Sequence, residues 1–144
     1  MKIQICYEKQ TTIEGFELIE TKYGMTGLEA ITDHSSEEIY VTECIDRMEY
    51  EDANKLISLA VQKLRLNGKL FINGTDLNSC CTSILNDNVS SEQFSEIIKV
   101  VNSLRNCVEV EKILKSLGVL IDTSLIKGTT YEIKATRTIG WNIL

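Results

Sequence analysis

The chain has 144 residues, 43% of them hydrophobic, which suits one globular domain over residues 1–144 with a single core. Its 21 acidic and 15 basic residues give a formal charge of -6, which argues against general nucleic-acid binding because that requires clustered Lys and Arg. No apolar run approaches the roughly 20 residues that cross a bilayer, and the N-terminus lacks a signal-peptide pattern, so we expect a soluble, cytoplasmic protein.

Cysteine and histidine offer little catalytic or metal-binding chemistry. The cysteines are odd in number and none is spaced like a zinc or redox motif: Cys6, Cys44, Cys80, Cys81 and Cys107. We expect reduced, mostly buried thiols. His34 is the only histidine and lies in a polar loop, so a catalytic Cys-His or Ser-His pair has a single candidate base. The sequence therefore predicts no metal centre.

The N-terminal half alternates short apolar runs with one long helical pattern. We predict strands at residues 2–6, 16–19, 39–44 and 69–73, and a loop-rich stretch at 24–36 with a short helical turn. Residues 50–66 carry apolar side chains at spacings of three and four, which predicts an amphipathic helix. Asn67 and Gly68 are expected to end that helix, because both tolerate a left-handed conformation.

The C-terminal half predicts three helices and a hairpin. Helical spacing covers residues 76–86, 91–105 and 108–117, with Ser90 and Gln93 placed as a capping box and Gly118 closing the last helix. Strands at 119–122 and 130–136 would form an antiparallel hairpin through Lys127 and Gly128. Together these elements predict an α/β, three-layer Rossmann-like sandwich whose sheet is mostly parallel, with an antiparallel C-terminal hairpin strand.

Several segments carry a resemblance to a known family. They are the strand at 2–5, the strand at 15–20 that ends in an acid, the acidic loop at 41–48, the turn at 64–70, and the closing turn and strand at 117–119 and 131–135. In this order they resemble the small class I S-adenosylmethionine-dependent methyltransferases. The resemblance implies S-adenosylmethionine as the cofactor, if one binds, at the carboxyl ends of the parallel strands.

The implied cofactor site departs from the pattern of that family. The crevice would be lined by Cys6, Tyr7, Glu8, Glu20, Glu43 and Cys44. Glu20 stands where an acid would hydrogen-bond the ribose hydroxyls. The family has glycines in the loop after strand one, so that backbone can approach the cofactor closely. Here Tyr7 would fill that volume and Glu8 would repel the methionine carboxylate, so the glycine-rich loop is degenerate. No residue is identified as catalytic.

Two functions remain open from the sequence. The favoured one is a methyltransferase-fold protein that has lost cofactor binding and serves as a binding, assembly or regulatory module. The alternative is an active small methyltransferase with a non-standard cofactor loop, which aligns methyl donor and acceptor. The acidic run from Glu43 to Asp52 is interpreted as a charged surface and helix N-terminus rather than a metal site.

The C-terminal tail predicts association with a protein partner or a second copy. It places Trp141, Ile143 and Leu144 beyond the last strand, and exposed apolar residues often mark partner surfaces. An unpaired strand edge invites another chain, and we expect the antiparallel strand near residues 130–136 to lie at or beside such an edge. The sequence thus predicts a homo-oligomer or larger assembly that buries this tail or this edge.

Overall fold

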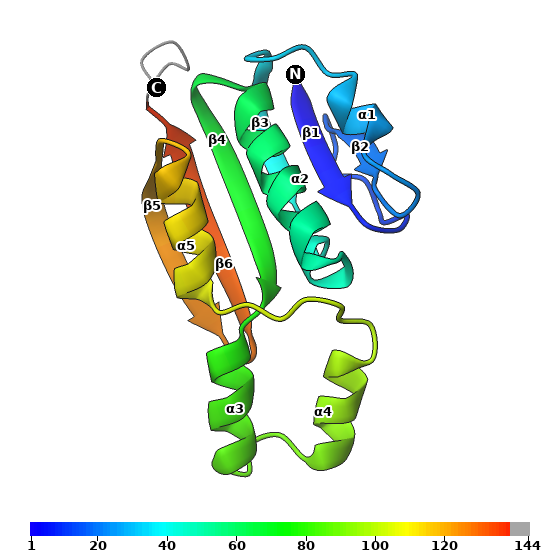
Figure 1. Ribbon diagram of the computed structural model, residues 1–144, viewed down its shortest axis with the longest axis vertical. Helices are drawn as coiled ribbons and strands as arrows, with labels where there is room; N and C mark the ends of the chain where they lie inside the picture. The colour runs from blue at the N-terminus through cyan, green and yellow to red at the C-terminus, as the bar shows by residue number, and fades with distance from the viewer. Residues whose placement is uncertain (139–144) are drawn as a thin grey trace.

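The computed structural model describes residues 1–138 and contains one six-stranded sheet flanked by helices (Figure 1). The strands are β1 Lys2–Cys6, β2 Glu17–Glu20, β3 Ser36–Val41, β4 Leu64–Thr75, β5 Val119–Lys127 and β6 Thr130–Arg137. The helices are α1 Thr26–Glu29, the 3-10 helix η1 Ile45–Arg47, α2 Tyr50–Lys63, α3 Leu77–Leu85, α4 Ser91–Ile98 and α5 Cys107–Ser116.

The sheet has the strand order β2-β1-β3-β4-β6-β5. β2, β1, β3 and β4 are parallel, and β6 runs antiparallel to both of its neighbours. The predicted α/β class, mostly parallel sheet and antiparallel hairpin are confirmed. The prediction of an antiparallel strand at or beside an edge near residues 130–136 is confirmed, since β6 lies next to the outermost strand. β6 is not itself an unpaired edge, because it pairs with β4 on one side and with β5 on the other. The strand at that edge of the sheet is β5.

α2 forms where the apolar spacing predicts it, but it ends three residues early. Its buried side chains face the sheet, and even Lys63 is buried, with its ammonium 2.6 Å from Asp33 Oδ1. The predicted cap at Asn67 and Gly68 is wrong. Leu64 already pairs with Ser36 of β3, so the chain enters β4 at once, and Asn67, at φ 63°, lies in a bulge between two paired segments.

The other helices follow the prediction except for the length of α4. The capping box of Ser90 and Gln93 is present, and Gly118 closes the turn after α5 at φ 78°. The helix predicted over residues 91–105 ends at Ile98, however. Beyond it the backbone N–H groups of residues 102 and 103 donate to the carbonyl of Asp46, and this pairing replaces further helical turns.

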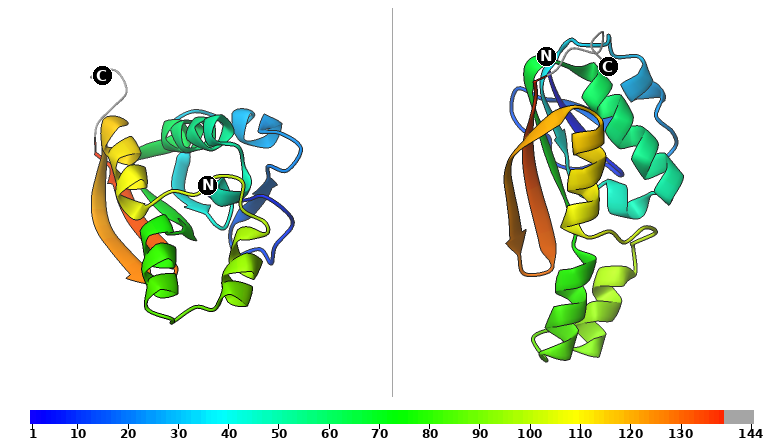
Figure 2. Two further views of the ribbon diagram at one scale, coloured as in Figure 1. Left: turned by 60° about the horizontal axis from the view of Figure 1, so that its bottom comes forward. Right: turned by 60° about the vertical axis from the view of Figure 1, so that its left-hand side comes forward.

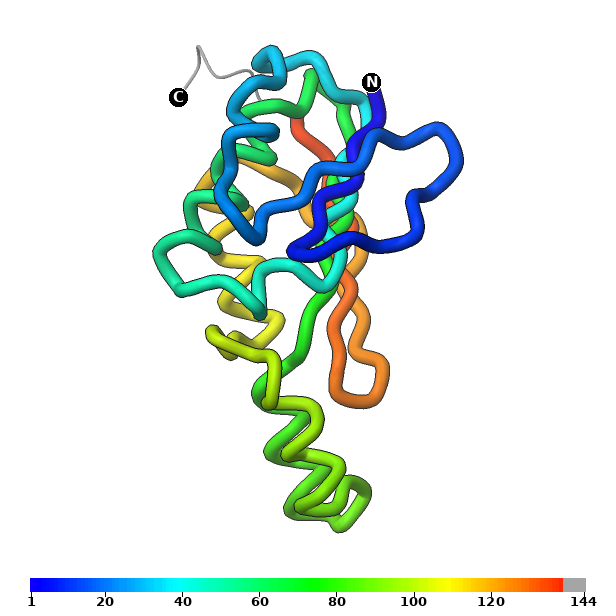
Figure 3. Tube along the Cα trace, turned by 90° about the vertical axis from the view of Figure 1, so that its right-hand side faces the viewer, coloured from blue at the N-terminus to red at the C-terminus, as the bar shows by residue number. Residues whose placement is uncertain are grey.

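All helices that pack on the sheet lie on one face. Figures 2 and 3 show α1, α2 and α5 on that side, while the loop over residues 7–16 covers part of the opposite side. No helix of residues 1–138 covers that opposite face, so the layer that a three-layer sandwich would place there is a loop. An aromatic row crosses the open face, with ring centroids 4.9 Å apart for Phe16 and Tyr40 and 5.1 Å apart for Tyr40 and Phe71.

The core lies between the sheet and the α2/α5 layer. Its members include Ile3, Ile5, Ile39, Leu56, Ile57, Leu70, Ile72, Val110, Leu114 and Ile133. α3 and α4 are different, since they project past the carboxyl ends of the strands as a separate pair (Figure 1). α4 buries no residue completely. The strand ends and α4 together frame the candidate site.

Candidate functional site

Two of the six predicted site residues are buried thiols. Cys6 ends β1, and its Sγ lies 3.7 Å from the carbonyl oxygen of Ile19. Cys44 directly precedes η1, and its Sγ lies 3.2 Å from Thr21 Oγ1. Burial raises the pKa of Cys44 to about 12 and raises that of Cys6 as well. Both therefore stay protonated at neutral pH and serve as packing groups.

Tyr7 and Glu8, at the carboxyl end of β1, contact basic side chains from other segments of the chain. The guanidinium carbon of Arg47 lies 4.9 Å from the ring centroid of Tyr7. Glu8 pairs with Lys22 at 2.8 Å and with Arg47 at 3.5 Å, and its hydrogen bond from Lys22 is the main reason that its pKa is lowered. The loops after β1 and β2 are thereby tied to η1, and a cavity of about 240 Å³ with Tyr7 and Arg47 in its wall lies beside them.

The last two predicted residues lie apart from that loop. Glu20 is the exposed final residue of β2, opposite Cys6 in the parallel register. Glu43 follows β3 with φ 48°, and its N–H donates to Asn73 Oδ1 at 2.7 Å. Of the six residues, Tyr7 lines the smaller cavity, Glu43 lines a larger one, and the other four line neither.

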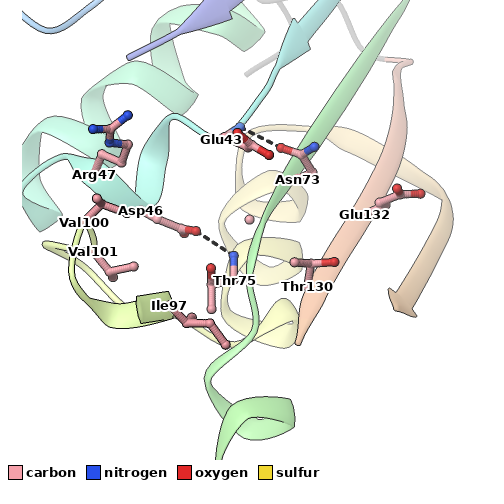
Figure 4. A pocket seen from close by; sticks show the side chains of 11 residues that line it. Glu43, Asp46, Arg47, Asn73, Thr75, Ile97, Val100, Val101, Thr130 and Glu132 are labelled. Carbon is pink, nitrogen blue, oxygen red and sulfur yellow. Dashed lines mark hydrogen bonds between the residues drawn. The ribbon is translucent and has the colours of Figure 1, made fainter. Parts of the chain in front are cut away.

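The larger cavity measures about 400 Å³ and opens where β3 and β4 end (Figure 4). Its lining residues come from the loop and helix after β3, from the end of β4, from α4 and the segment after it, and from β6. They are Glu43, Asp46, Arg47, Asn73, Gly74, Thr75, Ile97, Val100, Val101, Thr130 and Glu132. One wall is therefore acidic and polar, and the wall from α4 onward is aliphatic.

Asp46 is the most unusual residue of this cavity. Its side chain is directed toward β4, where Oδ2 accepts from the N–H of Thr75 at 2.6 Å (Figure 4). Oδ1 is buried and has no hydrogen-bond partner in the described part of the chain. Burial is the main cause of the raised pKa of Asp46. Sequence reasoning placed Asp46 on a charged surface, yet it is only 6% exposed.

Gly74 allows this arrangement. A Cβ on Gly74 would lie 2.7 Å from Tyr131 Oη and 2.8 Å from Asp46 Oδ1, so only glycine lets both buried groups approach the strand. Tyr131 Oη also lacks a hydrogen-bond partner within residues 1–138. A glycine near the end of a predicted strand was the available sequence signal for such a close approach.

The described residues contain neither a cluster suited to a metal ion nor a helix suited to a membrane. Within residues 1–138, no three His, Cys, Asp or Glu side chains converge as a metal site requires. In the same range, no helix is long and apolar enough to span a membrane.

Comparison with known proteins gives a result at the level of structure. No protein-family model matches the chain, and no curated protein is significantly similar to it in sequence. An O-methyltransferase family protein from Burkholderia thailandensis superposes with a TM-score of 0.63 at 15% identity, covering 87% of this chain and 36% of its own. A SAM-dependent methyltransferase from Archaeoglobus fulgidus gives 0.62 at 12% identity, covering 93% and 75%.

A third solved structure is magnesium protoporphyrin IX methyltransferase from Synechocystis, which contains bound SAH. It gives a TM-score of 0.57 at 13% identity and covers 85% of this chain and 51% of its own. The chain has the class I methyltransferase fold. It spans about a third of the length of the Burkholderia protein and about half that of the Synechocystis enzyme. Identities this low establish the fold alone.

Proposed function

We propose that this methyltransferase-fold protein has lost cofactor binding and serves as a binding, assembly or regulatory module. The closed carboxyl end of β1 is the observation that carries this proposal. Tyr7 stacks on Arg47, and Glu8 pairs with both Lys22 and Arg47, where a cofactor would need open backbone. These contacts link three segments and would have to break before a ligand could enter.

The residues present do not fit S-adenosylmethionine. A cradle for its methionine carboxylate needs glycines for close approach and N–H groups for the negative charge. Residues 7–12 contain no glycine, and β1 leads into a loop rather than a helix. Glu8 contributes a carboxylate that would repel the one on the cofactor. Of the residues expected at the cofactor site, only Glu20 is suited to accept hydrogen bonds from the ribose hydroxyls. One acidic residue is not enough to form a binding site.

Active methyl transfer is the second candidate. It is supported by the fold and by the cavity of about 400 Å³ at the strand ends, the usual ligand position in open parallel sheets. In this alternative, the cofactor would lie along Cys6, Tyr7, Glu8, Glu20, Glu43 and Cys44 after the loop opens. It requires the ion pairs of Glu8 to be replaced by contacts with the ligand.

Association is the second part of the proposal. A Haloferax volcanii methyltransferase of similar fold was solved in complex with the methyltransferase activator Trm112, with a TM-score of 0.60 at 9% identity. For this chain we propose a homo-oligomer or a protein partner that contacts the C-terminal tail. Trp141, Ile143 and Leu144 lie outside the described residues, so their contribution rests on their apolar character. The exposed Leu120 and Leu125 of edge strand β5 offer a second contact surface.

Backbone amide NMR of the full chain tests the proposal residue by residue. With S-adenosylhomocysteine added to millimolar concentration, the amides of Tyr7, Glu8 and Thr21 should keep their chemical shifts. Saturable shifts confined to these strand ends would support the enzyme instead. The amides of β5, at the opposite edge of the sheet from β2, report any non-specific effect.

A further inference from the structure

The larger cavity contains two carboxylates, Glu43 and Asp46, that form no ion pair within residues 1–138. Glu43 is exposed and forms no ion pair within residues 1–138, and its position is fixed by the N–H bond to Asn73. Asp46 is 6% exposed, and its Oδ1 lacks any hydrogen-bond partner in the described chain. A buried carboxylate without a full set of partners is costly, so a positive group placed beside it is favoured.

The cations around the cavity are engaged elsewhere. Arg47 stacks on Tyr7 and pairs with Glu8. Arg105 donates to Asn54 Oδ1 at 2.7 Å and to the carbonyl of Tyr50 at 2.9 Å. Its charge also favours the ionised form of Asp46, though less than the hydrogen bonds from Thr75 do. The third carboxylate of the lining, Glu132, is already paired with Lys127 at 3.2 Å. The unpaired charge of the cavity therefore comes from Glu43 and, in part, from Asp46, and it is negative.

The opposite wall indicates the rest of the ligand. Ile97, Val100 and Val101 line the cavity, and the Val100 side chain is 52% exposed. A hydrated metal ion would gain nothing from such a wall, and a divalent ion needs more converging oxygens than Glu43 and Asp46 supply. An alkyl chain would remove this apolar surface from water.

We infer that the cavity binds a small organic cation: an aliphatic amine or guanidinium group directed at Glu43 and Asp46, with its alkyl body against Ile97, Val100 and Val101. The same chemistry occurs in a free alkylamine and in a Lys or Arg side chain of a peptide. This inference rests on the proposed function, since it names the class of ligand that the module binds. The proposed cation site includes no residue of the loop after β1.

The test uses n-butylammonium, with n-butanol as its neutral counterpart of similar shape, followed by amide NMR of the full chain. Saturable shifts for the amides of Glu43, Asn73 and Val101 are expected with the cation and not with the alcohol. Equal shifts with both compounds, or no saturation with the cation in the tens of millimolar, would overturn the inference. A Lys-containing peptide compared with free butylammonium then distinguishes the two sources.

Variants that remove single carboxylates identify which of them binds the cation. Glu43→Gln should weaken cation binding about tenfold, as expected for loss of one close charge pair. Asp46→Asn should weaken it as well while leaving the fold intact. Glu96→Gln is the matched control, because Glu96 is an exposed α4 residue that does not line the cavity. Unchanged affinity in Glu43→Gln, or an equal loss in Glu96→Gln, would refute the site.

The outcome is separable from that of the proposed function. Cation binding is measured without S-adenosylmethionine. If no cation binds, the proposal that cofactor binding has been lost is unaffected. Conversely, a protein that binds both S-adenosylhomocysteine and butylammonium would refute the loss of cofactor binding but keep the cation site.

Discussion

The Arg47 guanidinium lies 4.9 Å from the ring centroid of Tyr7, and its Nη2 lies 3.5 Å from Glu8. One η1 side chain thereby holds two consecutive residues of the loop after β1. In the class I methyltransferase fold, this strand end is where a cofactor would approach the backbone. The side chains of Tyr7, Glu8 and Arg47 therefore contact one another at this strand end.

Opening this loop should restore some cofactor affinity. In a Tyr7→Gly, Glu8→Gly double variant, the ring and the repelling carboxylate are removed and two positions gain the freedom of glycine. We expect measurable binding of S-adenosylhomocysteine by the variant where the wild type shows none. Calorimetry at equal protein concentrations measures the difference. If neither protein binds, the loop is not what prevents binding, and the missing helix after β1 becomes the explanation.

Replacing Gly74 with Ala should destabilise the protein by about 1–3 kcal/mol, as overpacking of a buried site does. The added Cβ would lie 2.7 Å from Tyr131 Oη and 2.8 Å from Asp46 Oδ1. Gly27→Ala is the matched control, because its Cβ would meet a single atom, Cγ2 of Ile19, at 3.3 Å. Urea unfolding of both variants measures the effect, and equal losses would contradict the close approach at Gly74.

Asp46→Asn should stabilise the protein at neutral pH. Burial raises the pKa of Asp46 above its ordinary value of 3.8, so the folded state favours the protonated form. The stability that this group contributes is therefore complete below pH 3.8 and is lost as the pH rises through the raised pKa. Asn keeps an acceptor for the N–H of Thr75 and removes the buried charge.

The expected gain for Asp46→Asn is on the order of 1 kcal/mol at pH 7, falling toward zero in acid. Unfolding free energies of both proteins across this pH range provide the measurement. A variant that is less stable than the wild type at pH 7 would show that the Thr75 hydrogen bond and the Arg105 charge outweigh the cost of burying the carboxylate.

Removing residues 138–144 should abolish association while the domain stays folded. The truncation deletes Trp141, Ile143 and Leu144 but leaves β6 and its pairing with β4 and β5 intact. Analytical ultracentrifugation of both proteins at tens of micromolar measures the mass. If the full-length protein is a monomer and the truncation changes only its melting temperature, the prediction fails. The tail would then stabilise its own domain without mediating association.

The sequence predicted those elements whose cause is local. α2 follows from apolar spacing at Leu56, Ile57 and Ala60, and the capping box follows from Ser90 and Gln93. The missed end of α2 has a non-local cause, since the pairing of Leu64 with Ser36 joins β4 directly to the helix. The local signal of Asn67 and Gly68 was correct about a left-handed residue but not about its role.

The candidate site was harder to predict for the same reason. Tyr7 and Glu8 were singled out because they replace glycines, but their partner Arg47 lies about forty residues away and gave no signal. Asp46 is buried because its side chain meets Thr75 and Gly74 at the end of another strand. Local sequence shows only an acidic run there, so its burial depends on how two strands end side by side.

Calorimetric titration of the full wild-type chain with S-adenosylhomocysteine tests the central claim most directly. The closed loop predicts no saturable heat up to millimolar ligand, under conditions in which an active methyltransferase of this fold serves as the positive control. Saturable binding in the micromolar range would contradict the account, because it would mean that the contacts of Tyr7 and Glu8 with Arg47 give way to the cofactor.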